Sequence, residues 1–565
     1  MRLTFFTLIL LLLGLLSFSQ SPYPKNYFGM PLEIPLSLSG TFGELRNNHF
    51  HSGLDIKTSN KQGLPVYATA DGYVSRIKIG QYGFGKTLYL SHPNGYTTVY
   101  AHLQKFTNSV QKYVKKVQYE KEKYNIGNLF LKSGVFTVKK GDLIAYSGNT
   151  GSTKGPHLHF EIRDTKTKKV INPLHFGFAV KDTIIPSVQK LLAYPLSPDA
   201  SVNYFAKKAV LELKQVRAGK YTTKVINASG IIGFGVEVFD KLNGEPNKNG
   251  IYSLEMKVNG NRVYYHVVTS FSFAESKYIN LLIDYPYYKK YKTRVQKTHK
   301  VAASKLSLYQ DLINNGKIEI KEKHNYLVEI ICSDFNKNKT RITIPVKGVK
   351  SNMHFKQIDT TQYKIKASAF NKFTIKNMSV AFPKNSFYED CFIQLSFKNG
   401  LAKIHNPSIP LNKKYTLSFE ISHLSEKQKQ QLYIANVDNQ KYTRYIASKK
   451  KNNKIYAAVN SLGSYTLLYD DEKPEIKPVN FSNKQWVSKN KTLKVSIKDN
   501  QAGIDNYRAT INGKWILMEY NHKKGVLTYD FEDKKLIGSS HIFKIVVSDK
   551  VGNINSLSIN FFKKF

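Results

Sequence analysis

The sequence predicts an all-β protein in which an antiparallel β-sandwich domain precedes several smaller β-sandwich modules. Of its 565 residues, 37 are tyrosine and 33 are phenylalanine, two residue types that favour strands. Short runs of alternating hydrophobicity, such as residues 64–79, 86–103 and 157–164, are separated by turns rich in glycine, asparagine and proline. Beyond residue 180, a series of motifs occurs twice. The length is enough for three or four domains.

The chain is strongly basic, with a formal net charge of +45. Its lysines are spread along the whole length, and no nucleic-acid-binding motif is present. We therefore expect no nucleic acid partner. A diffuse positive surface suits a polyanionic neighbour such as a cell wall or an envelope surface. The alternative is that the charge only keeps the protein soluble.

Residues 1–19 have the pattern of a secretory signal peptide. A short basic start is followed by about a dozen apolar residues and then by small polar residues. Ser17 and Ser19 fit a small-x-small cleavage site, so the mature chain is expected to begin near Gln20. The apolar run is short for a transmembrane helix, and no later segment is long and apolar enough to span a membrane. The expected location is the periplasm and cell envelope, or the medium.

Residues 20–180 form the first β-sandwich domain of this prediction. One segment interrupts its rhythm of strands and turns. Apolar or aromatic residues recur there at nearly helical spacing, at Phe106, Val110, Tyr113, Val114 and Val117. We predict a charged amphipathic helix in an insertion that spans about residues 105–136.

The region beyond residue 180 contains two copies of one series of motifs. Each copy has an aspartate four residues before a proline, a strand-like run ending in aspartate, an Asn-Gly pair and a further aspartate. The first copy has Asp182, Pro186, Asp240, Asn259-Gly260 and Asp334; the second has Asp470, Pro474, Asp499, Asn512-Gly513 and Asp549. Two related immunoglobulin-like β-sandwich modules, residues 181–349 and 470–565, explain this order best. The alternative is chance similarity among turns.

Residues 350–469 lie between these copies and are predicted to form a β-rich module of unknown type. The two cysteines of the chain, Cys332 and Cys391, both lie in strand-like apolar runs. We expect two buried free thiols rather than a disulfide.

The stretch GNTGSTKGPHLHFEIR, residues 148–163, contains two histidines one residue apart. In a strand, side chains alternate between faces, so His157 and His159 would point the same way. Two imidazoles on one face can share a metal ion, or one can bind it while the other transfers protons. The alternative is a pair of surface histidines on a polar strand.

A second group lies in NHFHSGLDIKT, residues 48–58. His51 and Asp55 are four residues apart and can face one point, and histidine with a carboxylate is a good zinc pairing. His49 has the same parity and is a rival ligand. Together with His159, His51 and Asp55 make a three-ligand site. Such a site leaves the fourth tetrahedral position open for water, which is the catalytic arrangement.

Three patterns together resemble one family: HxxxD at residues 51–55, YAHL at 100–103 and SGNTGxTxGPHLHFE at 147–161. The family is that of the lysostaphin-type, or LytM-like, zinc metallopeptidases, which cleave peptide cross-links in bacterial peptidoglycan. The resemblance runs from about residue 32 to residue 178. It implies an antiparallel β-sandwich with an open groove over a zinc ion. It also implies that the zinc ligands are His51, Asp55 and His159, and that the catalytic histidines are His102 and His157.

The chemistry of such a site gives each residue a role. Zinc lowers the pKa of its bound water toward about 7 and polarises the scissile carbonyl. The sequence has no HExxH glutamate, so His102 and His157 are the expected proton acceptor and donor, with ordinary pKa values near 6.5. Glu161 shares the strand parity of His157 and His159, and is either a hydrogen-bonding partner of the site or simply solvated. The expected protein is a secreted zinc endopeptidase acting on peptidoglycan cross-links.

One departure from the family and two rival functions complete the prediction. Roughly thirty residues, 105–136, intervene where relatives have a short link, and we predict that this insertion lies beside the groove and narrows substrate access.

The first rival function is that of a catalytically silent wall-binding scaffold, or an activator of another cell wall hydrolase. The second is a wall-binding adhesin whose long β tail is the main functional part. The modules beyond residue 180 are expected to bind cell wall or an envelope protein.

Overall fold

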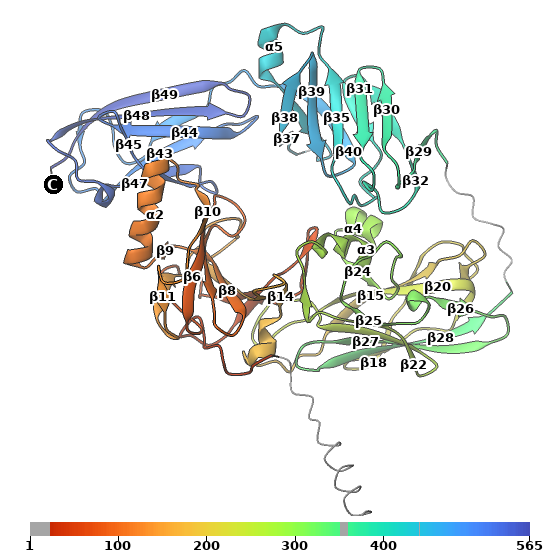
Figure 1. Cartoon of the computed structure of the whole chain (residues 1–565). Helices are drawn as coiled ribbons and strands as arrows, with labels where there is room; N and C mark the ends of the chain where they lie inside the picture. Colours follow the sequence, from red (N-terminus) through yellow and green to blue (C-terminus); the bar gives the residue numbers. More distant parts are fainter. Residues whose placement is uncertain (1–22, 351–359, 440, 565) are drawn as a thin grey trace, which may run out of the picture.

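The computed structural model describes residues 23–350, 360–439 and 441–564 of the chain (Figure 1). The predicted signal peptide, residues 1–19, lies outside the described residues. About 47% of the chain is strand and 8% is helix, which confirms the predicted all-β class. Within the described residues, three strand pairs are parallel and the others are antiparallel.

One large antiparallel sheet forms the body of the first domain. Its main strands, in spatial order, are β1 (Leu38–Gly40), β4 (Leu54–Lys57), β13 (His157–Asp164), β8 (Tyr96–Leu103), β7 (Lys86–Ser91), β6 (Gly72–Ile79) and β10 (Gly127–Phe130). A second sheet consists of β5 (Pro65–Tyr67), β12 (Leu143–Tyr146) and β9 (Lys105–Phe106). Shorter strands are β2 (Leu45–Arg46) paired with β3 (His49–Phe50), β11 (Thr137–Val138) paired with β6, and β14 (Val170–Ile171) paired with β13.

Alternation along the sequence decides which face of each strand is buried. In β6, the side chains of Val74, Ile77 and Ile79 are all buried, although Val74 and Ile77 are an odd number of residues apart. A bulge between Val74 and Arg76 places an extra residue in the strand and so restores the alignment. These side chains share one core with those of the second sheet, such as Val66.

The segment between β8 and β12 contains one helix and the strands β9, β10 and β11. Helix α2 (Asn108–Lys121) buries Val110, Val114 and Gln118, which lie on one face at helical spacing. Glu122 ends the helix in a left-handed conformation, with φ of 46°. The chain then adds β10 to the edge of the sheet beside β6.

Residues 187–348 form a second β unit. Its main path runs through β17 (Ala209–Leu211), β15 (Ser187–Pro195), β20 (Ile226–Phe239), β28 (Lys339–Gly348), β27 (Asn325–Ser333), β21 (Ser253–Val258), β22 (Asn261–Val267) and β25 (Tyr309–Leu312). The side strands are β16 (Ser201–Val202), β18 (Lys214–Arg217), β19 (Lys220–Thr222), β24 (Val295–Lys297) and β26 (Ile318–Ile320). Buried side chains from the whole path, among them Leu191, Phe234 and Ile330, form one core.

The second unit is joined to the first domain by a strand and by packing. Strand β23 (Ser270–Phe271) pairs with β14 of the first domain. The helices that follow are η2 (Ser276–Tyr278), α3 (Ile279–Leu282) and α4 (Tyr285–Tyr291). Phe271, Leu282 and Leu308 belong to the core of the first domain, so the two units share hydrophobic packing.

Two further β-sandwiches follow, each with two sheets over its own core. The sheets of the third unit are β30 (Asn371–Ile375), β31 (Met378–Phe382), β35 (Tyr415–Glu420), β39 (Lys454–Val459) and β38 (Ser448–Lys451), and β33 (Leu395–Lys398), β34 (Leu401–Ile404), β40 (Gly463–Tyr469), β36 (Leu432–Asn436) and β37 (Arg444–Ile446). This unit also has β29 (Tyr363–Ile365) paired with β32 (Cys391–Ile393), and helix α5 (Glu426–Gln431). The sheets of the fourth unit are β41 (Glu475–Pro478), β43 (Thr492–Lys498), β47 (Val526–Asp530) and β46 (Met518–Asn521), and β42 (Gln485–Trp486), β49 (Ile554–Phe562), β48 (Ser540–Asp549), β44 (Ile504–Ile511) and β45 (Lys514–Trp515).

The repeated motifs adopt the same local structure in both copies. The Asn-Gly pairs at 259–260 and 512–513 have positive φ at both residues and connect β21 to β22 and β44 to β45, as a type I′ hairpin turn requires. Asp334 and Asp549 each accept a hydrogen bond from the backbone amide of the asparagine four residues later, at 2.8 and 2.9 Å. The two series of motifs therefore mark equivalent turns.

Figure 1 shows the four units arranged in a ring, in which the fourth unit (blue) returns to helix α2 of the first domain (orange). At this contact the rings of Tyr119 and Trp515 lie 5.2 Å apart. Cys332 is buried and Cys391 is half-buried, and both are free thiols. In the part of the chain that the structure describes, no helix is long and apolar enough to cross a membrane.

Candidate metal centre

Two neighbouring strands bring the predicted ligands together. Strand β13 pairs with β4, and His159 lies directly opposite Asp55. Directly opposed residues of antiparallel strands share a face, so both side chains project to the same side of the sheet. His51 lies just before β4, and its backbone amide donates to the Glu44 carbonyl at 2.9 Å. This bond holds the end of the loop that carries His51.

The three donor atoms converge on one point. His51 Nε2 lies 3.0 Å from Asp55 Oδ1 and 3.1 Å from His159 Nδ1, and His159 Nδ1 lies 2.8 Å from Asp55 Oδ1. All three residues are buried. Ligands bound at 2.0–2.1 Å to a tetrahedral zinc ion lie roughly 3.3 Å apart. The observed spacing is close to that value, and the group could hold a metal ion.

The second ring nitrogen of each histidine in this cluster contacts an oxygen. His51 Nδ1 lies 2.7 Å from the Thr41 carbonyl oxygen, and His159 Nε2 lies 2.9 Å from Glu161 Oε1. A ring nitrogen in such a contact donates its proton, so the lone pairs are left at His51 Nε2 and His159 Nδ1. These are the two nitrogens that face Asp55.

The charges around the site favour a cation at its centre. Asp55 Oδ2 accepts a hydrogen bond from Arg46 Nη2 at 2.7 Å, which leaves Oδ1 directed at the histidines. Burial alone would raise the pKa of Asp55, but the neighbouring imidazoles hold it well below its usual range. Burial alone would lower the pKa of His159, yet hydrogen bonds to its two carboxylate neighbours raise it to about 9. The site therefore stabilises positive charge, which a proton or a metal ion can supply.

Glu161 is a buried partner of the site rather than a solvated residue. Its side chain is fully buried, and it contacts both His159 and Arg163, whose Nε donates to Glu161 Oε2 at 2.6 Å. Ser52 Oγ also donates to it. Burial alone would raise the pKa of Glu161, but Arg163 and these hydrogen bonds lower it to about 2. The structure thus decides between the two interpretations of this residue.

His102 reaches the site through an unusual backbone conformation. Its neighbour Ala101 lies opposite His159, so a regular strand would direct residue 102 to the other face. His102 instead has a φ of 62°, a strained value for a residue other than glycine. The His102 ring consequently lies 4.8 Å from the His157 ring and 5.9 Å from the His159 ring. Its Nδ1 lies 2.8 Å from the Thr150 carbonyl oxygen.

His157 lies on the more open side of the cluster. Its side chain is 15% exposed, more than those of the three converging residues. Its Nδ1 lies 2.9 Å from the Gly155 carbonyl oxygen, and its Nε2 lies 3.5 Å from Asp55 Oδ1. His102 and His157 therefore both use Nδ1 for a backbone contact, which leaves Nε2 of each available.

The glycine-rich loop before β13 packs against the loop before β7. Gly151 has a φ of 78°, and a β-carbon there would lie 2.2 Å from the Gly83 carbonyl oxygen, so only glycine fits. Ser152 stabilises the contact, because its backbone amide donates a hydrogen bond to the Gly83 carbonyl at 2.8 Å. The packed loops position Thr150, whose carbonyl holds His102.

The rival ligand His49 does not reach the cluster. It is exposed, and its Nδ1 lies 2.6 Å from the Asn47 carbonyl oxygen. Three contributors were absent from the sequence prediction: Arg46, the Thr41 carbonyl, and Phe84, whose ring lies 4.9 Å from the His159 ring. None of them belongs to a motif with recognisable spacing, so only the fold reveals them.

The first domain matches a known protein family. Residues 49–119 and 124–173 match Peptidase family M23. This part of the chain is similar to peptidase family M23. It is the lysostaphin-type family that the motifs resemble, so the predicted resemblance is confirmed. The match is interrupted at the end of helix α2, within the insertion. Residues 362–470 match a second family, the Zu5-like domain, in the segment for which the sequence indicated no type.

Several proteins that are similar to this chain are named as peptidases. The chain is 34% identical over 156 residues to an uncharacterized metalloprotease of Haemophilus influenzae, covering 26% of this chain and 27% of that protein. It is 34% identical over 144 residues to the DD-carboxypeptidase/endopeptidase Mpg of Neisseria meningitidis serogroup B, covering 25% and 27%. A solved zinc containing peptidase from Vibrio cholerae is 30% identical, covers 24% of this chain and 37% of that chain, and gives a TM-score of 0.18. The chain spans about a quarter of the length of the curated relatives it matches.

Proposed function

We propose that this chain is a zinc endopeptidase that hydrolyses peptide cross-links of bacterial peptidoglycan. The observation that carries the proposal is the convergence of His51 Nε2, Asp55 Oδ1 and His159 Nδ1 within 3.1 Å of one another. Two imidazole nitrogens and a carboxylate are a donor set suited to zinc, and three protein ligands leave one tetrahedral position open. The names of the similar proteins support the same chemistry.

A zinc ion held by these residues would supply Lewis-acid catalysis near neutral pH. The rest of the work falls to the chain itself. Arg46 fixes the Asp55 carboxylate, and the Thr41 carbonyl fixes the His51 ring. Glu161 fixes the His159 ring and its tautomer.

We assign proton transfer to His102 and His157. Burial and the two neighbouring histidines lower the pKa of His102 to about 3, so its ring is neutral near pH 7 and carries a lone pair. The pair has two Nε2 atoms available on the same side of the sheet as the ligands. This arrangement suits the removal of a proton from the attacking water and its delivery to the leaving amine.

The location and the role of the β units belong to the same proposal. We place the protein outside the inner membrane, in the periplasm and cell envelope or in the medium, because its proposed substrate lies there. The net charge of +45 supports adhesion to an anionic wall. The units beyond residue 180 would then hold the peptidase on cell wall or on an envelope protein.

The test is to count amino groups newly released from isolated peptidoglycan of several wall types. We expect release by the zinc-loaded wild type and none above background by Asp55→Ala, because this variant lacks one of the three proposed ligands. Bound zinc, measured on the same samples, should fall in parallel.

His49→Ala is the matched control for this experiment. It removes an exposed imidazole two residues from His51 without touching the converging atoms, so we expect wild-type release and wild-type zinc content. If the folded, zinc-loaded wild type released no amine from any wall, the catalytically silent scaffold would replace the endopeptidase as the proposed function.

A further inference from the structure

A second cluster of potential metal ligands lies in the second unit, away from the metal centre. Asp182, Asp240 and Asp334 come from three different segments: the linker before β15, the end of β20 and the turn after β27. One carboxylate oxygen of each lies within 4.8 Å of the others. Among the described residues, none of the three forms an ion pair with a basic side chain.

Asp240 is buried without a partner for one of its oxygens. The residue is only 4% exposed, and Oδ1 has no hydrogen-bond donor within the described residues. A buried carboxylate oxygen without a donor is destabilising. Burial and the two neighbouring carboxylates, Asp182 and Asp334, raise the pKa of Asp240 to about 8. The fold thus leaves a buried carboxylate oxygen that a cation would satisfy.

Asn249 adds a second unpartnered group on the same face. It pairs directly with Asp240 across an isolated antiparallel bridge, and each backbone amide donates to the other's carbonyl. Residues paired in this way share a face. Asn249 is 3% exposed, and neither its Oδ1 nor its Nδ2 has a partner among the described residues. Its amide oxygen is therefore available as a fourth ligand.

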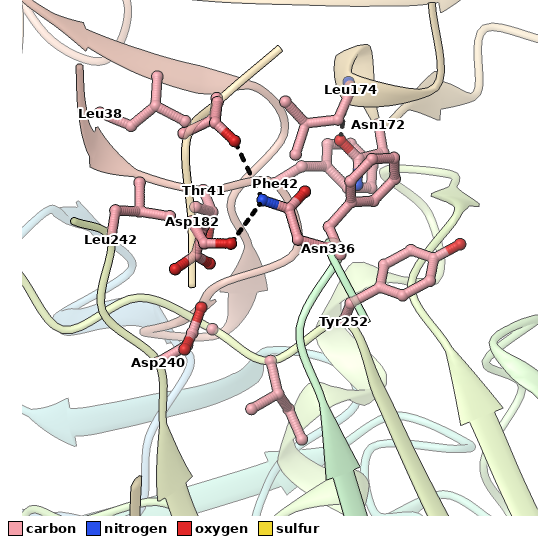
Figure 2. A pocket seen from close by; sticks show the side chains of 14 residues that line it. Leu38, Thr41, Phe42, Asn172, Leu174, Asp182, Asp240, Leu242, Tyr252 and Asn336 are labelled. Atoms are coloured by element: carbon pink, nitrogen blue, oxygen red, sulfur yellow. Dashed lines mark hydrogen bonds between the residues drawn. The ribbon is translucent and has the colours of Figure 1, made fainter. Parts of the chain in front are cut away.

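Two of the three aspartates, Asp182 and Asp240, line a small cavity at the junction with the first domain, shown in Figure 2. The cavity has a volume of about 30 Å³, enough for one water molecule or ion. In Figure 2 the side chains of Asp182 and Asp240 are directed toward each other. Thr41 of the first domain also lines the cavity, and its buried Oγ1 has no partner in the described part of the chain.

We propose that Asp182, Asp240 and Asp334, with the Asn249 amide oxygen, bind one calcium ion at this junction. Carboxylate and amide oxygens are the hard ligands that calcium prefers. Calcium binds oxygens at 2.3–2.6 Å, so ligands on opposite sides of one ion lie up to roughly 5 Å apart, which accommodates the observed separations. The ion would neutralise the like charges that now face one another.

The equivalent cluster in the fourth unit lacks the feature that carries this proposal. Asp470, Asp499 and Asp549 also converge. There the carboxylate of Asp499, the counterpart of Asp240, accepts hydrogen bonds from the backbone amides of Gln501 and Gly503 at 3.1 and 2.6 Å. Its charge is stabilised by the turn itself. This copy therefore provides an internal control for the first.

The position of the ion would connect the second unit to the metal centre. Thr41 lines the cavity, and its carbonyl oxygen contacts His51 Nδ1 at 2.7 Å. An ion that orders the cavity would consequently restrict the loop that orients a zinc ligand. This consequence is separate from the proposed peptidase activity, and the calcium site can be tested without any substrate.

The experiment measures calcium binding and thermal unfolding of the full-length, zinc-loaded protein. We expect the wild type to bind one calcium ion in this unit, with a Kd of about 10⁻⁴–10⁻³ M, the range of extracellular modules, and its Tm to rise with calcium concentration. Asp240→Asn should have a higher Tm than the wild type without calcium, because it removes a carboxyl group whose burial beside two other carboxylates is unfavourable. It should bind one ion fewer and show at least a tenfold weaker response of Tm.

The controls make each outcome decisive. Asp499→Asn should keep the calcium response of the wild type. Asn249→Ala should weaken this response, and it serves as the test variant if Asp240→Asn fails to fold. The proposal is wrong if the wild type binds no calcium up to about 10 mM, tenfold above the expected range, or if Asp240→Asn binds as the wild type does. An equal response to magnesium would contradict the assignment of calcium.

Discussion

At the residue scale, the orientation of the two histidines proposed as metal ligands, His51 and His159, depends on neighbouring groups that are not themselves proposed ligands. Glu161 is fully buried and accepts from His159 Nε2 at 2.9 Å. It thereby keeps the lone pair of His159 at Nδ1, directed at Asp55. Since the charge of Glu161 also raises the pKa of His159, it makes this ring a stronger ligand for any cation.

We expect Glu161→Gln to weaken zinc binding about 10- to 100-fold, the range found when such outer partners are removed. The amide can still accept from His159, but the negative charge is lost and Arg163 loses its partner. Competition with a chromophoric chelator measures the affinity. Glu255→Gln is the matched control, because it removes a carboxylate that pairs with Arg262 at 2.7 Å in β21 and β22. Unchanged zinc affinity in a folded Glu161→Gln would contradict this role.

The sequence predicts the converging residues but not the groups that orient them. The two-residue period of a strand places His157, His159 and Glu161 on one face, and the structure agrees. The same period misplaces His102, because its φ of 62° reverses the expected face; only the family resemblance assigned it. Arg46 reaches Asp55 through a side-chain contact that no periodicity encodes.

At the element scale, the second unit contains buried histidines that make it sensitive to acid. His266 in β22 is 1% exposed, and its Nδ1 lies 2.8 Å from the Tyr264 hydroxyl. Burial lowers the pKa of His266 to about 4, and burial with two nearby lysines lowers that of His299 to about 3. Both rings are neutral when folded, whereas unfolded histidine takes up a proton near pH 6.5.

We therefore expect the stability of the second unit to fall as the pH drops below 6.5. A depressed pKa means that the unfolded state binds more protons between pH 6.5 and pH 4, so the free energy of unfolding decreases toward acid. At about 1.4 kcal/mol for each pKa unit, His266 alone accounts for about 2 kcal/mol by pH 5. His266→Gln should remove roughly this part of the pH dependence.

Pulsed hydrogen exchange across a urea series, read on peptides from β21 and β22 in the presence of a chelator, measures this stability. His324→Gln is the control, since His324 is an exposed turn residue of the same unit. A pH dependence as steep in His266→Gln as in the wild type would show that other groups dominate.

The element types were predictable where the sequence is locally regular. The Asn-Gly pairs at 259–260 and 512–513 form hairpin turns because both residues must adopt positive φ. The segment from β23 to α3 shows the limit of such reasoning. It lies within the second unit in sequence, yet Phe271 and Leu282 pack into the core of the first domain, a long-range choice that hydrophobicity alone does not reveal.

At the scale of the whole molecule, the fourth unit closes the ring on helix α2 of the first domain (Figure 1). Tyr119 of α2 is the hub of this contact: its ring lies 5.2 Å from that of Trp515 and 4.1 Å from Lys534 Nζ. A second contact reaches the glycine-rich loop, where Lys523 Nζ donates to the Asn149 carbonyl at 2.7 Å. The insertion thus contacts the fourth unit. That it also narrows substrate access stays a prediction.

We expect Tyr119→Ala to open the ring. Tyr119 is half-buried, and truncating an aromatic anchor of an interface costs about 2 kcal/mol. The other contacts of this interface include the rings of Tyr82 and His522, 4.7 Å apart, and the ion pair of Lys86 with Glu519 at 2.9 Å. Lys116→Ala is the control on the same helix, because Lys116 is exposed and pairs only within α2, with Glu120.

Trp515 reports on the opening, since it is 8% exposed against Tyr119 and the chain has one other tryptophan, Trp486. In a Trp486→Phe background, Tyr119→Ala should shift Trp515 emission to longer wavelength and increase the radius of gyration in solution scattering, whereas Lys116→Ala should change neither. Because the fourth unit contacts the loop that positions His102 through Thr150, release of amines from peptidoglycan should also rise when the ring opens. Emission and scattering identical to the closed wild type would mean that the remaining contacts hold the ring without Tyr119.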